Sequence, residues 1–330
     1  MIRVLPSLVA VAVAVAIAPG SAGAQEGLFA FVSNEGSRTI SVIRTTDHTV
    51  VATIPVEARP RGIRVSPDGQ RAYVALSDDQ PNQQGGLDAI AEIDVTTRRV
   101  VARHRVGTDP EQFVVTPDGT RIYAANEDAG LATSIDLRTG QVLAEMTVGI
   151  EPEGVAVSPD GRWVYVTAET SNTVSVIDTR VDEVVANLLV DVRPRSAAFA
   201  PDGRRAYVTA EIGGTLSVID ARRHEVLDIV PLGDEEAKPV GVVVSPDSRW
   251  VYVALGAADA VAVVDARTDE VAATIPVGRR PWGIAVSGDG RRVYTANGVS
   301  GDVSVIDTAT RRVVATVKVG TLPWGVALTR

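Results

Sequence analysis

YVTAE occupies residues 165–169 and occurs again at 207–211, 42 positions further along the chain. Variants of this pentapeptide continue the series before and after it. They are FVSNE (31–35), YVALS (73–77), YAANE (123–127), YVALG (252–256) and YTANG (294–298). All six tyrosines of the protein hold the first position of the motif, and Phe31 holds it in the remaining copy. The chain is therefore built from seven repeats.

Each repeat contains four short segments separated by polar turns. In one unit they are GVAVS (154–158), RWVYVTA (162–168), NTVSVID (172–178) and EVVANLLV (183–190). The first turn is Pro-Asp-Gly or a variant of it, in which Pro fixes φ, Asp bonds its own backbone and Gly accepts a positive φ. Segments rich in Val and Ile between regularly spaced turns are typical of β-strands. We therefore interpret the aspartates of these turns as structural.

A period near 42 residues with four strands per unit is typical of a β-propeller blade. The repeats begin with a second strand, LFAFVSN (28–34), and end with a first strand, WGVALTR (324–330). We predict an all-β, seven-bladed β-propeller of four-stranded blades. Its C-terminal strand, near 324–329, joins the N-terminal blade, which closes the ring without an open sheet edge.

The N-terminus has the order of a secretory signal peptide. Arg3 precedes an apolar run over 8–18, then Pro19-Gly20 and a small-residue site ending at Ala24. The run is too short to cross a bilayer as a helix. We therefore expect a signal peptide over 1–24, a propeller over 25–330, and a periplasmic or secreted protein without a membrane span.

Composition excludes several functions. The chain has no cysteine, so it has no disulfide, thiolate metal site or C-x-x-C-H haem attachment. Its net charge is −9 and no basic stripe is present, which argues against a nucleic-acid partner. His48, His104 and His224 fall on fourth strands, away from the channel, and we expect them on the surface. We predict no catalytic residue, no resident cofactor, and a monomer.

Charge diversity concentrates on one face of the predicted ring. There the loop into each first strand carries an x-Pro-x motif at the mouth of the channel, and the fifth motif position lies nearby. Both departures from the 42-residue period, at 77–87 and 232–239, also fall on this face. Such variation is typical of a binding surface. The predicted ligand- or partner-binding residues are Arg59, Arg61, Asp109, Glu111, Glu127, Glu151, Glu153, Glu169, Arg193, Arg195, Glu211, Arg280, Trp282 and Trp324.

Three interpretations of this face stay open: solvated rim ion pairs, capture of a polar ligand or partner, and catalysis. The one chemical route is a divalent cation held by carboxylates, since oxygen ligands suit Ca²⁺ and Mg²⁺. Glu111, Glu151 and Glu153 are its candidate ligands, with Glu127 and Glu169 as further ones. The neighbouring arginines would compete for the same carboxylates. Trp282 and Trp324 serve either as packing groups or as a ligand platform.

The repeats YVTAETSNTVSVIDT (165–179) and YTANGVSGDVSVIDT (294–308) resemble the YVTN family of propeller repeats. DPEQFVVTPDG (109–119), IEPEGVAVSPDGRW (150–163) and VRPRSAAFAPDGRRAYVTAEIGGTLSVID (192–220) extend the resemblance to the PQQ-dependent catabolism-associated β-propeller proteins. This resemblance implies a periplasmic setting beside PQQ-dependent alcohol oxidation or an associated transporter. It supplies no catalytic residues. Seven blades, four Trp and no Cys do not match a PQQ dehydrogenase, which has eight Trp-rich blades.

These observations lead us to expect a non-catalytic binding or scaffold propeller that captures a periplasmic protein or a small polar ligand. A metal-assisted enzyme of the lactonase or lyase type is the first alternative. A cell-surface module, as in surface-layer proteins that carry YVTN repeats, is the second.

Overall fold

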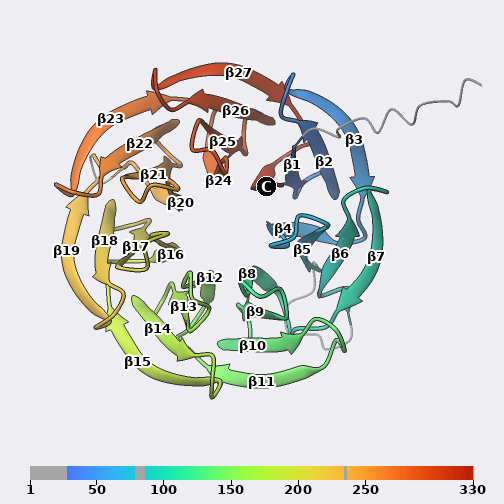
Figure 1. Ribbon diagram of the computed structural model, residues 1–330, viewed down its shortest axis with the longest axis vertical. Coiled ribbons are helices and arrows are strands. Elements are labelled where there is room, and N and C mark those ends of the chain that lie inside the picture. The colour runs from blue at the N-terminus through green and yellow to red at the C-terminus, as the bar shows by residue number, and fades with distance from the viewer. Residues whose placement is uncertain (1–27, 79–85, 234–235, 330) are drawn as a thin grey trace, which may run out of the picture.

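The structure of the protein is a computed structural model that describes residues 28–78, 86–233 and 236–329. The expected signal peptide over 1–24 lies outside the described residues. Within them every regular element is a β-strand, and no helix is present that could cross a membrane. The strands form seven sheets of four around a central opening, as predicted (Figure 1).

In each sheet one strand lies at the channel and the next three follow outward in chain order. Listed outward, the first four blades are β28 (Pro323–Leu328), β1 (Phe29–Asn34), β2 (Thr39–Arg44), β3 (Thr49–Pro55); β4 (Arg59–Val65), β5 (Arg71–Ser77), β6 (Ala89–Asp94), β7 (Arg99–His104); β8 (Pro110–Val115), β9 (Arg121–Asn126), β10 (Leu131–Asp136), β11 (Val142–Thr147); and β12 (Pro152–Val157), β13 (Trp163–Ala168), β14 (Thr173–Asp178), β15 (Glu183–Leu189).

The remaining three blades repeat the pattern, and all neighbouring strands within a blade are antiparallel. They are β16 (Pro194–Phe199), β17 (Arg205–Ala210), β18 (Thr215–Asp220), β19 (Glu225–Pro231); β20 (Pro239–Val244), β21 (Trp250–Leu255), β22 (Ala260–Asp265), β23 (Glu270–Pro276); and β24 (Pro281–Val286), β25 (Arg292–Asn297), β26 (Asp302–Asp307), β27 (Arg312–Lys318).

The two ends of the chain close the ring in one sheet. β28 pairs with β1, and Phe31 stands opposite Ala327 in their register. The Phe29 amide donates a hydrogen bond of 2.7 Å to the Thr329 hydroxyl. The predicted closure is therefore correct, and each first strand contacts the first strands of the two adjacent blades.

The recurring aromatic residue explains why the pentapeptide repeats. Tyr123, Tyr165 and Tyr207 are fully buried and pack between neighbouring blades with valine and alanine side chains. Each lies opposite a residue of the innermost strand, so the ring sits directly behind the channel wall. The aromatic position thus fixes the spacing between blades.

The turn aspartates have the structural role expected of them. Asp68 accepts hydrogen bonds from the Ser66 hydroxyl, at 2.6 Å, and from the Gln70 amide, at 3.0 Å. The hydroxyl bond and the amide bond lower the pKa of this carboxyl. The same amide bond two residues ahead occurs in the other five Pro-Asp-Gly-type turns, at Asp118, Asp160, Asp202, Asp247 and Asp289.

The opposite face is shaped by the x-Pro-x motif. The residue before the proline has a positive φ in six blades, from 47° at Asp109 to 61° at Arg193. The pairing register between first and second strand shifts just after the proline, as between Pro60 and Ile63. At this irregular start of the strand the side chain after the proline is buried, as at Glu111, Glu153 and Arg195, and the side chain before the proline is more exposed. Arg59 is the exception, since its φ is not positive and β4 begins at this residue.

Candidate functional site

Three carboxylates meet at the channel mouth. Asp109 precedes β8, Glu111 lies on β8, and Glu127 follows β9, so one blade supplies all three. One oxygen from each carboxylate lies within 4.8 Å of the others. We call Asp109, Glu111 and Glu127 the acidic cluster. Grouped oxygen donors of this kind can share a proton or hold a divalent cation.

Glu111 is the buried member of the acidic cluster. Its side chain is 0% exposed and neither carboxylate oxygen has a hydrogen-bond donor among the described residues. Burial, reinforced by Glu153, raises the pKa of Glu111 well above its usual value, although Arg61 opposes the shift. Burial also raises the pKa of Glu127, with Glu153 and Asp109 adding to it. The cluster therefore favours a proton or a cation between its oxygens.

Arginines from the neighbouring blade border the acidic cluster. The Arg61 guanidinium lies 3.0 Å from a Glu111 oxygen, and Arg59 lies 3.6 Å from Asp109. Burial disfavours the charge of Arg61, but Glu111 and Glu35 outweigh it and the pKa of Arg61 is raised. Arg61 is therefore a permanent cation beside the cluster.

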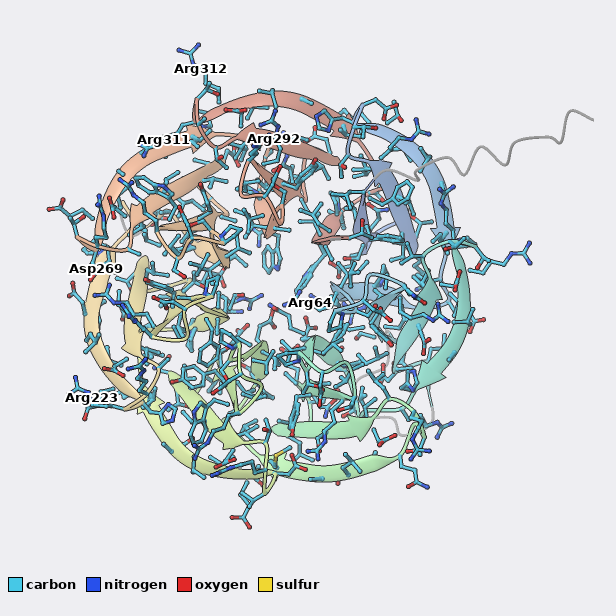
Figure 2. The ribbon with its side chains drawn as sticks, viewed as in Figure 1. Arg64, Arg223, Asp269, Arg292, Arg311 and Arg312 are labelled. Atoms are coloured by element: carbon cyan, nitrogen blue, oxygen red, sulfur yellow. The ribbon has the colours of Figure 1, made fainter. Side chains whose placement is uncertain are left out.

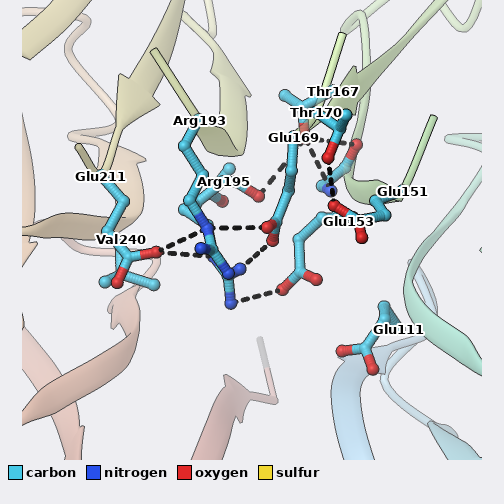
Figure 3. Close-up of polar contacts among 12 residues, drawn as sticks. Glu111, Glu151, Glu153, Thr167, Glu169, Thr170, Arg193, Arg195, Glu211 and Val240 are labelled. Carbon is cyan, nitrogen blue, oxygen red and sulfur yellow. Dashed lines mark hydrogen bonds and ion pairs between the residues drawn. The ribbon is translucent and has the colours of Figure 1, made fainter. Parts of the chain in front are cut away.

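A second charged group lies on the next blades, at Arg193 and Arg195. Arg195 is buried, forms an ion pair with Glu169 and lies 3.3 Å from Glu153. Arg193 lies 2.8 Å from Glu169 and 3.3 Å from Glu211. Figure 3 shows the two arginines enclosed by these carboxylates, while Glu111 stands apart and faces the space beside Glu153.

The carboxylates that lie together in the structure are not the three that were expected to bind a cation. Glu153 is engaged with Arg195, and the exposed Glu151 accepts a hydrogen bond from the Thr170 hydroxyl. Glu111 from the expected ligands and Glu127 from the further ones join the mutually close carboxylates, and Asp109 completes the group. Chain spacing placed Glu151 beside Glu153, but the intervening proline turns their side chains apart.

The two tryptophans lie together on adjacent blades. The ring centroids of Trp282 and Trp324 are 6.2 Å apart. Arg195 and Arg280 each lie 5.0 Å from the centre of the Trp282 ring, and Arg61 lies 5.8 Å from that of Trp324. Cation–π contacts of this kind connect the tryptophans to the charged half of the mouth.

The histidines correct the sequence analysis. His104 was expected on the surface but is buried, and its Nε2 lies 3.0 Å from Glu92. His48 and His224 are half-buried, and the Tyr165 hydroxyl lies 2.7 Å from Nδ1 of His224. His48 and His224 lie against tyrosines of a neighbouring blade, whereas His104 contacts Glu92 of its own blade. All three lie away from the channel mouth, as expected.

Comparisons with known proteins identify two family models in different parts of the chain. The model of the lactonase, 7-bladed beta-propeller family matches residues 190–322. The model of the cytochrome D1 heme domain matches residues 111–193. No curated protein matches the sequence. The chain is therefore a seven-bladed β-propeller whose sequence similarities point to enzyme and haem-binding families.

Solved structures share this fold at low identity. Kuenenia stuttgartiensis hydrazine synthase has a TM-score of 0.75 and 22% identity, covering 84% of this chain and 92% of that one. A putative 6-phosphogluconolactonase from Bacteroides uniformis has a TM-score of 0.77 and 18% identity, covering 92% and 100%. The dihydro-heme d1 dehydrogenase NirN in complex with DHE has a TM-score of 0.66 and 16% identity, covering 90% and 74%.

The family matches overturn the expectation of a non-catalytic scaffold. The chain matches the lactonase model over 190–322 and a haem-domain model over 111–193, so its sequence similarities lie with enzyme and haem-binding propellers instead. The expectation that the protein is not an enzyme was wrong for the same reason. It rested on absent motifs, whereas carboxylate sites have no fixed sequence pattern.

The residues of this chain do not fit a haem. Axial haem ligands are His, Cys, Met or Tyr. The chain has no Cys, and its three His lie on outer strands. None of these residue types lines the central channel among the described residues. The lactonase match therefore agrees better with the chemistry present at the mouth.

Proposed function

We propose that the protein is a metal-assisted lactone hydrolase whose site is the acidic cluster at the channel mouth. The observation that carries the proposal is the placement of Asp109, Glu111 and Glu127 within 4.8 Å of one another, with Glu111 fully buried. The family match over 190–322 supports the reaction class.

The donor set fits a hard divalent cation. All three groups are carboxylates, the ligand type that Ca²⁺ and Mg²⁺ prefer. Burial and the neighbouring Glu153 disfavour the ionised form of Glu111, and Arg61 offsets this only in part. A cation at this position would supply a Lewis acid for the lactone carbonyl and for water.

The neighbouring groups suit the remaining steps of ester hydrolysis. Arg61 lies beside Glu111, and its Nε has no hydrogen-bond partner among the described residues, so it is available to stabilise negative charge on the carbonyl oxygen. Glu153 faces the same space (Figure 3) and is available to take a proton from the attacking water. As the acyl C–O bond of the ring breaks, Glu153 would return this proton to the ring oxygen, which yields a hydroxy acid.

A hollow of about 510 Å³ on the same face gives the substrate a place to bind. Glu127 forms part of its wall, together with Glu151 and the segment 147–150. Because the wall is polar as well as apolar, we propose a small polar lactone as the substrate, with hydroxyl groups that contact these carboxylates.

The setting of the reaction is also a proposal. The N-terminal sequence supports export, and the resemblance to YVTN and PQQ-dependent catabolism-associated propellers supports a periplasmic site of action. We propose that the protein acts there as a monomer on a small molecule.

The test is hydrolysis of dihydrocoumarin and of glucono-δ-lactone by chelated protein, before and after addition of Ca²⁺, Mg²⁺ or Mn²⁺. We expect activity only with a cation. Glu111→Gln should lower kcat/KM at least 100-fold. The matched control is Glu57→Gln, an exposed carboxylate in the loop between β3 and β4 on the same face, which should retain activity within 3-fold. Equal activity of wild type and Glu111→Gln would overturn the proposal.

A further inference from the structure

One charged residue interrupts an otherwise apolar level of the channel wall. In every blade one residue of the first strand pairs with the motif aromatic, and these residues occupy equivalent positions around the channel. Arg64 is this residue in the blade of Tyr73. In the six other blades the position holds only valine or alanine: Val114, Ala156, Ala198, Val243, Ala285 and Ala327. The repeat therefore does not require an arginine here, and the fold accommodates a methyl-sized side chain.

No carboxylate forms an ion pair with Arg64 among the described residues. Its guanidinium donates one hydrogen bond of 2.9 Å to the Ile63 carbonyl and one of 3.4 Å to Oε1 of Gln112. Both acceptors are neutral. Since a guanidinium has five N–H donors, several remain for another partner. By contrast, four arginines at the mouth each have a carboxylate nearby: Arg59, Arg61, Arg193 and Arg195.

Arg64 lines a cavity in the channel. The cavity has a volume of about 760 Å³ and extends along the first strands to the Pro-Asp-Gly turns, where Pro67, Pro117 and Pro159 form part of its wall. Trp282 and Trp324 also line it, whereas the acidic cluster does not. Figure 2 places Arg64 beside the central opening of the ring.

The environment of Arg64 is unfavourable for a lone charge. Burial lowers the pKa of Arg64 to about 10, so the side chain still carries its charge at neutral pH. An uncompensated cation against apolar walls costs stability that alanine or valine at this position would not cost. A ligand anion in the cavity would remove this cost.

We infer that the channel cavity is a second binding site, distinct from the acidic cluster, which takes an organic carboxylate with an apolar body and pairs the carboxylate with Arg64. The planar guanidinium matches a carboxylate with two parallel hydrogen bonds. The valine, alanine and tryptophan walls suit an aliphatic or aromatic body. Because Arg64 supplies one positive charge, the site favours a ligand with one negative charge. The cavity volume is in the range of small-molecule sites.

The experiment measures binding of octanoate and of its neutral isostere octanamide by isothermal titration calorimetry at pH 7. For wild type we expect octanoate to bind at least 10-fold more tightly than octanamide. In Arg64→Leu the two affinities should fall within 2-fold of each other. Arg64→Gln provides a second, more polar replacement should the leucine variant fold poorly. Melting temperatures establish that each variant is folded.

Two control variants separate this site from other effects. Arg204→Leu removes an exposed charge from the turn beside the same channel end and should leave the preference for octanoate unchanged. Glu111→Gln should also leave it unchanged, because the acidic cluster does not line the cavity. Equal binding of the two probes to wild type, no binding of octanoate, or an unchanged preference in both Arg64 variants would each overturn the inference.

Discussion

The Arg61 guanidinium lies 3.0 Å from the fully buried carboxylate of Glu111, across the boundary between two adjacent blades. Arg61 stabilises the ionised form of Glu111, whereas Glu153 and Glu127 both disfavour it. The ion pair therefore contributes both to the packing of neighbouring blades and to the electrostatics of the proposed site.

Removing only the cation should destabilise the protein. We expect Arg61→Met to lower the free energy of unfolding by about 3 kcal/mol, since it leaves a buried carboxylate without its partner. Urea denaturation at pH 7 measures this change. The double variant Arg61→Met/Glu111→Leu should recover most of the loss, because it removes both charges. If the double variant is no more stable than Arg61→Met, the pair is not the source of the effect.

The acidic cluster should make stability fall as pH rises. Above its ordinary pKa of 4.5 an unfolded Glu111 releases its proton, whereas the folded protein, in which this pKa is raised, releases it only at higher pH. The unfolded state then binds fewer protons, so stability decreases with rising pH from about this value upward. From pH 4.5 to pH 8 the melting temperature of chelated wild type should fall progressively relative to that of chelated Glu111→Gln. A difference independent of pH would contradict this account.

His224 should act with the opposite sign. Burial, with Arg162 adding to it, lowers the pKa of His224 below 6.5, despite Asp220. As pH falls below 6.5 the unfolded chain takes up a proton that the folded protein resists, so stability is lost. His224→Gln should reduce the loss of melting temperature between pH 7 and pH 5. A variant that follows the wild-type curve throughout this range would exclude His224 as a source.

The closure of the ring can be tested by truncation. Deleting 323–330 removes β28 and exposes the edge of β1, which normally pairs with it. We expect a melting temperature at least 10 °C lower and concentration-dependent association, because open strand edges pair between molecules. Thermal unfolding and light scattering measure both effects. A truncated protein that stays monomeric and equally stable would show that β28 does not hold the ring closed.

The fold could be predicted almost completely from the sequence. The phase of Tyr123, Tyr165 and the other motif aromatics identified the second strands, and the incomplete units at both ends predicted the closing strand. A repeat strengthens such a prediction because the strand boundaries in each copy of the motif agree with those in the other copies. The same regularity placed Arg61, Glu111 and Glu153 on one face.

The details of the site could not be predicted in this way. Which carboxylates meet depends on the turn of the chain at each proline, so Glu151 and Glu153 separate while Glu111 meets Glu127 from a different strand. Arg64 gave no signal until the strand register placed it among alanines and valines. Enzymatic character was missed because a carboxylate cluster has no fixed motif, and comparison with the lactonase and cytochrome d1 models supplied the correction.

The most direct test of the proposed lactone hydrolase is a titration of chelated protein with a divalent cation, following bound metal by elemental mass spectrometry and lactone hydrolysis in parallel. We expect one equivalent of cation to bind as activity reaches its maximum, and both to disappear in Asp109→Asn/Glu127→Gln but not in the exposed control Glu57→Gln. Hydrolysis that proceeds equally in chelated protein, or a cation that binds without any gain in activity, would contradict the account.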